Sequence, residues 1–262
     1  MRNGKLKKSL YVVGGNGFVG SHIKGVKQSL DVSFASSGDW EVPRSLPIGS
    51  TVLFLRAISS PYSVAIDPIE SESINVSRTS RYISDCIELG HRVIFSSSDT
   101  VYGNRLETAA KESDIVCPFG LYAEQKNKIE SLFQSNPKFL SIRFSIIVGE
   151  NSKLRKLLLT GEVIEISHPV FRNPVGINDV KSLIVATTLM GNWESALGAN
   201  LINCGGDSLI SIWELAHIEA LRLDVKTPVK SIRNPIDFMS RPEAVNLDSS
   251  LAESIIGRKL QF

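Results

Sequence analysis

The sequence has few cysteines and histidines, and they form no pattern that would hold a metal ion or a disulfide network. Its three cysteines are far apart, no CxxC pair occurs among the 262 residues, and the four histidines are scattered. Zinc sites and disulfide frameworks need paired or regularly spaced ligands. We therefore expect reduced thiols and no metal site.

The sequence also lacks a long apolar run and an excess of one charge. No stretch approaches the roughly 18 apolar residues that a membrane-spanning helix requires. The first apolar stretch, 10–13, runs directly into glycines and does not resemble the core of a secretory signal. With 29 basic and 27 acidic residues the formal net charge is +2, which gives no bias toward nucleic acid or an anionic membrane. We expect a cytoplasmic protein that binds neither.

What the sequence does contain is an alternation of apolar, strand-like runs with helix-like segments. A hydrophobic content of 42% is enough for the core of one sizeable domain. The expected strands are 9–13, 31–36, 51–55, 91–98, 139–149 and 201–206, and the expected helices are 21–30, 71–89, 121–133, 153–160, 177–190, 211–222 and 249–256. Such alternation favours parallel strands with right-handed crossovers. The fold class is therefore α/β, a Rossmann-type doubly wound parallel sheet with a small C-terminal substrate lobe.

Regularity changes along the chain and suggests its domain organisation. Residues 1–150 alternate cleanly and are expected to form a dinucleotide-binding domain, to which 174–204 return. The rest of 151–262 is less regular, and we expect it to form most of a substrate-binding lobe. Ligands of open α/β sheets bind beyond the carboxyl ends of the strands. The candidate site residues fall at such ends or on the helix that follows.

A glycine-rich turn joins the first strand to the first helix. Gly14, Gly17 and Gly20 recur every three residues in GGNGFVG. One glycine permits the tight turn, one lets backbone amides approach a pyrophosphate, and one lets the helix pack close to the sheet. Between a strand and a helix, this motif predicts a site for the diphosphate of a dinucleotide.

The residue at the end of the second strand indicates which dinucleotide is preferred. NAD-binding folds usually place an acidic side chain there, on the ribose hydroxyl. The matching residue is Ser36, which leaves room for a 2′-phosphate, and the sequence shows no well-placed arginine to hold that phosphate. NADP is therefore mildly favoured over NAD.

Three polar residues form a candidate proton-transfer set. Tyr122 and Lys126 are four apart and share one face of the expected helix, and Ser98 ends a strand 24 residues before Tyr122. An ammonium near a phenol stabilises the phenolate and is expected to bring the pKa of Tyr122 down from about 10. The set predicts hydride transfer at a carbinol carbon with proton transfer at its oxygen.

In combination, these motifs resemble the extended short-chain dehydrogenase/reductase family, of the NAD-dependent epimerase/dehydratase type. GGNGFVG is similar to the family's TGGxGFIG turn, FSSSDTVYG (95–103) to its SSSxxVYG stretch, and YAEQK (122–126) to its YxxxK pair. Further similar elements, spread along nearly the whole chain, are LRA (55–57), INVSRT (74–79), GINDV (176–180), INCGG (202–206) and DSSLAESIIG (248–257).

The resemblance implies a role for individual residues. The catalytic set would be Ser98, Tyr122 and Lys126. The cofactor-binding residues would be Gly14, Asn16, Gly17, Phe18, Val19, Ser36, Leu55, Ala57, Asn75 and Lys126. The substrate side would contain Asp99, Ser145, Arg172 and Arg241, with the arginines available to a substrate phosphate.

Departures from the family patterns narrow the implied activity. Dehydratases carry Asp-Glu after the catalytic Ser or Thr, whereas Asp99 is followed by Thr100, so the base that removes water is missing. Many epimerases have an asparagine where this chain has Ile146. The stretches 143–147 and 240–248 are closer to the RTSW and RPxNSxLD elements of deoxysugar 4-ketoreductases.

Two other departures concern the cofactor side of the family pattern. Arg56 stands where the family has a small alanine, and the 38–50 segment is shorter than usual. The resemblance assigns no role to Arg56, and the short segment implies an abbreviated adenine pocket.

The leading hypothesis is an NAD(P)H-dependent reductase of a nucleotide-linked 4-keto-6-deoxy sugar in cell-surface polysaccharide biosynthesis. The second is a nucleotide-sugar epimerase with retained NAD, which would turn over without net consumption of reduced cofactor. The third is a non-catalytic dinucleotide-binding sensor or subunit, against which the presence of Tyr122 and Lys126 argues. By family analogy we expect a homodimer through the helices at 71–89 and 121–133.

Overall fold

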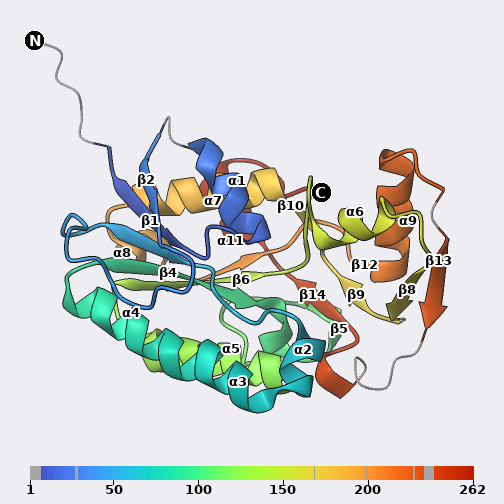
Figure 1. Cartoon of the computed structure of the whole chain (residues 1–262), viewed down its shortest axis with the longest axis horizontal. Coiled ribbons are helices and arrows are strands. Elements are labelled where there is room, and N and C mark those ends of the chain that lie inside the picture. Colours follow the sequence, from blue (N-terminus) through green and yellow to red (C-terminus); the bar gives the residue numbers. More distant parts are fainter. Residues whose placement is uncertain (1–6, 27–28, 168, 199, 227, 233–238) are drawn as a thin grey trace, which may run out of the picture.

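A parallel sheet forms the centre of the protein in a computed structural model that describes residues 7–26, 29–167, 169–198, 200–226, 228–232 and 239–262 (Figure 1). The strand order is β11-β6-β4-β3-β1-β2, and each adjacent pair is parallel. The strands are β1 (Ser9–Val13), β2 (Asp31–Phe34), β3 (Thr51–Phe54), β4 (Arg92–Ser98), β6 (Phe139–Phe144) and β11 (Leu201–Cys204). The expected α/β class with a Rossmann-type sheet is confirmed.

The strand order places a ligand crevice at β1. The chain runs from β1 to β2 on one side and then returns to β3 on the other side. The order therefore reverses at β1, and in open α/β sheets the crevice beyond the carboxyl ends at such a point is where ligands bind.

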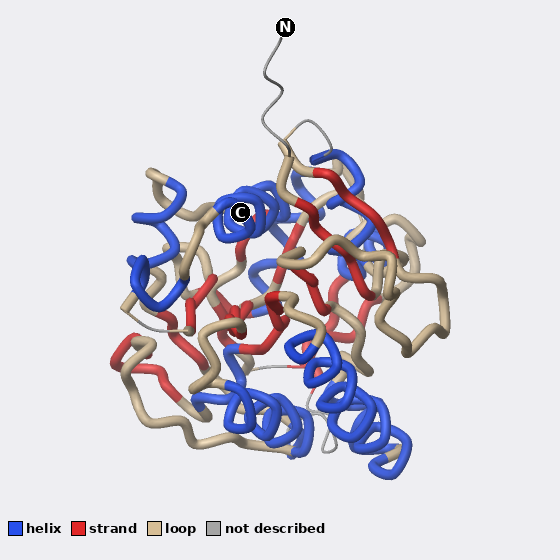
Figure 2. The backbone as a smooth tube through the Cα atoms, turned by 90° about the vertical axis from the view of Figure 1, so that its left-hand side faces the viewer, coloured by secondary structure: helices blue, strands red, loops and turns tan. Residues whose placement is uncertain are grey.

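Helices cover both faces of the sheet (Figures 1 and 2). One face carries α1 (Phe18–Ile23), α7 (Ile177–Leu189) and α11 (Ser250–Ile256), and the other carries α4 (Thr79–Glu88) and α5 (Leu121–Phe133). Side chains of a strand alternate between faces. Leu10 and Val12 accordingly belong to one buried apolar cluster, and Tyr11 and Val13 to the other.

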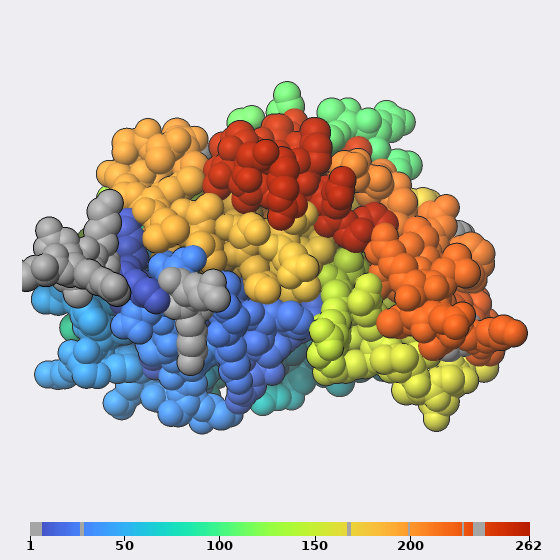
Figure 3. All heavy atoms as spheres, turned by 90° about the horizontal axis from the view of Figure 1, so that it is seen from above, coloured from blue at the N-terminus to red at the C-terminus, as the bar shows by residue number. Residues whose placement is uncertain are grey.

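A smaller lobe lies beside the carboxyl ends of the sheet strands and occupies one end of the molecule (Figures 1 and 3). It consists of α6 (Lys153–Leu158), β8 (Ile164–Ser167), β9 (Phe171–Arg172), β12 (Ile210–Ser211), α9 (Ile212–Arg222) and β13 (Val229–Ile232). Strand β8 pairs in parallel with β13, and β9 pairs antiparallel with β12. A separate apolar cluster that includes Leu158, Ile164 and Ala216 forms its core.

Several short elements complete the fold. Strand β14 (Val245–Leu247) pairs with β5 (Arg105–Ala110), and β10 (Val175–Gly176) pairs with β7 (Ile147–Val148). The short helix α8 (Trp193–Leu197) precedes β11. In the part of the chain that the structure describes, no helix has the length and apolar content needed to span a bilayer.

Element boundaries differ most from the expected ones at three places, and elsewhere by no more than two residues. Helix α1 begins at Phe18, directly after the glycine turn, and passes into a 3-10 turn over Lys24–Val26. The helix expected at 71–89 begins earlier, as α3 (Pro68–Glu72), and reaches α4 through a π-helical turn over Ser73–Arg78. The strand expected over 139–149 is divided into β6 and β7, because the chain changes its pairing partner from β11 to β10.

Candidate active site

The turn between β1 and α1 forms one wall of a cleft at the carboxyl edge of the sheet. Gly17 N donates to Gly14 O at 3.1 Å, which closes the turn. Gly14 has a φ of +94°, where a side chain would be strained, and a Cβ on Gly20 would lie 2.4 Å from Gly14 O. Gly17 is different, because its φ is −71° and a Cβ there would meet no atom closer than 3.4 Å. The fold therefore requires glycine at 14 and 20 but not at 17.

Ser98 and Tyr122 line the same cleft, and Lys126 is buried next to Tyr122. Ser98 ends β4, and the other two lie one turn apart on α5. Lys126 Nζ lies 5.7 Å from the centre of the Tyr122 ring. A hydroxyl, a phenol and an ammonium are thus close enough to act on one reacting group.

Lys126 is buried, and the backbone holds its ammonium. Nζ donates to Ser96 O at 2.7 Å and lies 4.7 Å from the centre of the Phe95 ring. Burial lowers the pKa of Lys126 to about 8, because loss of water disfavours the charged form, and the Glu130 carboxylate raises it in part. The ammonium is therefore charged at neutral pH but holds its proton weakly.

The pKa of Tyr122 lies above its ordinary value. Burial raises it most, the Asp99 carboxyl raises it further, and the nearby Ser98 hydroxyl lowers it in part. The expectation that Lys126 lowers this pKa differs from the structure, because the ammonium donates to the Ser96 carbonyl. A phenol with a raised pKa is protonated at neutral pH, which is the form that donates a proton.

Asp99 is buried directly beside this set. Ser98 Oγ donates to Asp99 Oδ1 at 3.2 Å, and Arg172 Nε lies 3.5 Å from Asp99 Oδ2. Burial raises the pKa of Asp99, and Arg172 lowers it in part, as do the nearby polar groups of Ser145, Ser98 and Thr100. Arg172 also donates to the backbone carbonyls of Phe171, Pro242 and Glu243. The lobe and the sheet therefore meet at this ion pair.

A second buried ion pair holds α5 against the sheet one turn beyond Lys126. Arg143 Nη2 donates to Glu130 Oε2 at 2.6 Å, and Ser141 Oγ donates to Glu130 Oε1 at 2.8 Å. The two charged side chains are only 6% and 4% exposed. Both donors come from β6, so the pair sets the position of α5, and with it that of Tyr122, relative to the sheet.

The glycine turn, Ser98 and Tyr122 line one cleft of about 460 Å³, and Lys126 is not among its lining residues. Of the residues expected at the site, it brings together Gly14, Gly17, Phe18, Val19, Leu55, Ala57, Ser98, Asp99, Tyr122, Ser145, Arg172 and Arg241. A neighbouring cavity of about 740 Å³ shares Ile146, Ile147 and Arg241 with the cleft and extends into the lobe. Together they offer room for an elongated ligand.

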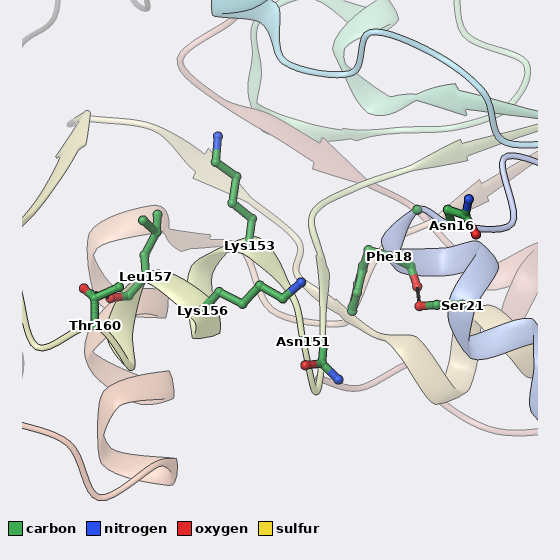
Figure 4. Close-up of a pocket in the computed structure, with 9 residues that line it drawn as sticks. Asn16, Phe18, Ser21, Asn151, Lys153, Lys156, Leu157 and Thr160 are labelled. Carbon is green, nitrogen blue, oxygen red and sulfur yellow. Dashed lines mark hydrogen bonds between the residues drawn. The ribbon is translucent and has the colours of Figure 1, made fainter. Parts of the chain in front are cut away.

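A third groove runs along the outer side of the glycine turn (Figure 4). Asn16 and Phe18 line it from the turn and α1, and Lys153 and Lys156 line it from α6. Figure 4 shows the Lys156 side chain extending from α6 toward Phe18 and Asn151. The Lys156 ammonium therefore faces the turn, whereas the Lys153 side chain extends away from it (Figure 4), and a cation there suits an anion bound at the turn.

Asn75 and Ser36, two further residues expected to bind the cofactor, are placed by contacts with neighbouring segments. Asn75 Nδ2 donates to Gln125 Oε1 at 2.9 Å, and Ile58 N donates to Asn75 Oδ1 at 2.9 Å, so Asn75 ties the loop after β3 to α5. Ser36 is exposed, and its carbonyl accepts a hydrogen bond from Arg56 Nη2 at 3.3 Å. The fold thus places Arg56 next to Ser36, where the sequence alone showed no well-placed arginine.

Sequence reasoning missed the short helices that follow β3. Ser60 caps α2 (Pro61–Ile66) and Asp67 caps α3, each directly before a proline at the first helical position. A capping residue followed by proline is a recognised signal for a helix start and would have located both. The omission matters because Ser59 and Pro61 line the cleft. Among the described residues, no group of three or more metal-ligating side chains occurs.

The positions of these groups in the fold define the class of protein. A strand-end serine and a tyrosine line a cleft together with the glycine turn that follows β1, and a lysine lies one helical turn from the tyrosine. This is the arrangement of extended short-chain dehydrogenases/reductases, and the class expected from the sequence is confirmed.

A family comparison then gives the particular group. The family described as RmlD substrate binding domain matches residues 8–261, and the chain belongs to this family. Its enzymes are NAD(P)-dependent oxidoreductases of the short-chain dehydrogenase/reductase type. Among curated protein sequences, none matches the chain at a significant level.

Solved structures share the fold over nearly the whole chain. MoeE5 in complex with UDP-glucuronic acid and NAD is 20% identical, with a TM-score of 0.79 over 97% of this chain and 94% of that one. A dTDP-4-dehydrorhamnose reductase from Bacillus anthracis in complex with NADP is 15% identical, with a TM-score of 0.79 over 97% and 94%. RMD from Pseudomonas aeruginosa, complexed with NADPH, is 20% identical, with a TM-score of 0.77 over 99% and 94%.

Proposed function

We propose that the protein is an NAD(P)H-dependent reductase of a nucleotide-linked 4-keto-6-deoxy sugar. The observation that carries the proposal is that Ser98 and Tyr122 line one cleft with the glycine turn, with the Lys126 ammonium 5.7 Å from the centre of the Tyr122 ring. Membership of the RmlD family supports it, as does the likeness to a structure named as a dTDP-4-dehydrorhamnose reductase.

The residues of the cleft fit a nicotinamide dinucleotide. Gly17 has no side chain although the fold does not require a glycine there, so its backbone is open to a diphosphate. Phe18 and Val19 continue that wall, and Leu55 and Ala57 line the adenosine side. When bound, the dinucleotide supplies a hydride to the ketone carbon. Ser36, in place of an acidic residue, favours NADP over NAD.

The side chains of the catalytic set then handle the proton. The Ser98 hydroxyl binds the ketone oxygen, and Tyr122 donates its proton to that oxygen as the carbon is reduced. Lys126, one helical turn from Tyr122, holds the nicotinamide ribose. Because the pKa of Tyr122 is raised, the phenol is protonated before each turnover.

The substrate side of the cleft is assigned to Asp99, Ser145, Arg172 and Arg241. Arg241 lines both the cleft and the larger cavity, where a guanidinium suits the diphosphate of a nucleotide sugar. In this proposal residues 1–150, joined by 174–204, bind the dinucleotide, and the rest of 151–262 forms most of the substrate lobe.

We extend the proposal to the oligomeric state of the protein and to the pathway and compartment in which it acts. Helices α4 and α5 would form the interface of a homodimer, by family analogy, and Leu132 on α5 is 59% exposed. Light scattering that gives a monomeric mass at micromolar concentration would contradict this. The reaction would serve cell-surface polysaccharide biosynthesis in the cytoplasm.

The test is to mix the pure protein with NADPH or NADH and a panel of nucleotide-linked 4-keto-6-deoxy sugars. We expect absorbance near 340 nm to fall with at least one sugar. No oxidation across the panel would refute the reductase. Interconversion of a nucleotide sugar without net oxidation of NADPH or NADH would favour the epimerase instead.

A further inference from the structure

Arg56 reaches across the carboxyl edge of the sheet from one strand end to another. It follows β3, Ser36 follows β2, and β1 lies between these two strands. Arg56 Nη2 donates to Ser36 O at 3.3 Å, and Nη1 donates to Asp39 O. Adjacent strands are about 4.8 Å apart. The side chain therefore spans the width of β1, immediately outside the glycine turn.

An aromatic platform holds the guanidinium in this position. Its central carbon lies 4.6 Å from the centre of the Trp40 ring. Trp40 in turn packs against Phe54 and Tyr82, with ring centres 6.3 and 6.5 Å away. Because the plane of the guanidinium is fixed by the indole and by two carbonyls, little side-chain freedom remains to be lost when a ligand binds.

The guanidinium keeps donors for a further partner. The two hydrogen bonds to Ser36 and Asp39 use two of its five N–H groups, counting contacts with the described residues. The Asp39 carboxylate accepts a hydrogen bond from Glu41 N at 2.9 Å, a contact within the 39–41 segment. A preorganised arginine fork beside an exposed serine suits a phosphate rather than a neutral hydroxyl pair.

We propose that Arg56 is the residue that recognises the 2′-phosphate of NADP(H). This inference rests on the proposed function, because it assumes a dinucleotide over the glycine turn. Leu55 and Ala57, on either side of Arg56, line the cleft. An adenosine ribose bound there adjoins the ends of β1 and β2, where Ser36 leaves room for the phosphate. Arg56 then supplies the charge that selects NADP(H) over NAD(H).

The test is direct binding of NADPH and NADH, measured by their fluorescence with no sugar present. We expect the unsubstituted protein to bind NADPH more tightly than NADH by at least about tenfold, as charge-assisted bonds to a phosphate imply. Arg56→Ala should remove this preference by weakening the binding of NADPH alone. Arg78→Ala is the matched control, because Arg78 is exposed and lies 5.8 Å from the same indole; its ratio should stay within about twofold of the unsubstituted one.

A second variant covers the case in which Arg56→Ala disturbs the loop after β2. Ser36→Asp changes an exposed side chain and places a carboxylate beside the guanidinium, so the preference should turn toward NADH. Suppose that Arg56→Ala weakens the binding of NADPH and of NADH equally, and that Ser36→Asp leaves the ratio of the two affinities unchanged. Arg56 would then be assigned to the adenine, and the proposal would be overturned. An unchanged ratio in both variants would also overturn it. Because no sugar is used, failure here leaves the reductase assignment standing, and failure of the sugar panel leaves this result standing.

Discussion

Lys126 Nζ donates to the backbone carbonyl of Ser96 at 2.7 Å, which ties helix α5 to strand β4 two residues before Ser98. The bond places an ammonium in a buried position, where its charge is unfavourable for folding but close to the phenol it serves.

Replacing Lys126 with methionine should stabilise the protein in neutral and acidic solution while reducing its activity. The pKa of Lys126 is about 8 in the fold and 10.5 as its ordinary value. Between these values the unfolded chain holds more protons, so the stability contributed by this group rises with pH over that window. Lys126→Met should therefore gain on the order of 2–3 kcal/mol at pH 6 and nothing above pH 10.5. Urea unfolding at several pH values measures the difference in the free energy of unfolding between Lys126→Met and the unsubstituted protein. A difference independent of pH would contradict the burial of the charge.

Replacing Tyr122 with phenylalanine should stop proton donation without disturbing the fold. We expect the rate of ketone reduction to fall about 10²- to 10⁴-fold, with NADPH binding unchanged in a fluorescence titration. The matched control is Tyr102→Phe, which removes a buried hydroxyl bonded to Asn203 Oδ1 and Lys111 O, each at 2.9 Å. That variant should lose about 1 kcal/mol of stability and keep its rate. Undiminished turnover by Tyr122→Phe would remove the mechanism.

Alanine at two of the turn glycines should separate the fold from the ligand site. Gly20→Ala places a Cβ 2.4 Å from Gly14 O and 2.7 Å from Gly15 Cα, and should destabilise the protein by roughly 3 kcal/mol or more. Gly17→Ala meets no atom closer than 3.4 Å and should change stability by less than about 1 kcal/mol. It should nevertheless weaken NADPH binding, because the methyl group occupies the approach of the diphosphate. Thermal unfolding and fluorescence titration decide between these outcomes, and tight NADPH binding by Gly17→Ala would place the diphosphate elsewhere.

Breaking the buried ion pair on α5 should cost far more stability than breaking an exposed one on the same helix. Glu130→Ala leaves the Arg143 guanidinium uncompensated and should destabilise the protein by about 3–5 kcal/mol. Lys128→Ala removes a pair with Glu72 whose side chains are 53% and 39% exposed, and should cost less than about 1 kcal/mol. Urea midpoints of the two variants provide the comparison. Similar losses in both would show that the Glu130–Arg143 pair is not what anchors α5.

Local patterns in the sequence were enough for the long elements and for the polar set at the site. The expected helix 121–133 has the bounds of α5, because its apolar spacing and the residues that flank it are local. The glycine turn was located because a strand and a helix adjoin it in the chain. By contrast, β9, β12 and the other short strands carry too few residues for a pattern, and each depends on a partner that is distant in sequence.

The sequence by itself determined the positions along the chain of the sheet strands and the long helices, the glycine turn and the spacing of Tyr122 and Lys126, since each is set by neighbours along the chain. Only the tertiary structure decided which charges meet. Asp99 and Arg172 pair because the lobe folds back on the sheet, and Arg56 reaches Ser36 because β1 is placed between β2 and β3. Burial, which raises the pKa of Tyr122 and lowers that of Lys126, depends in the same way on how distant segments pack.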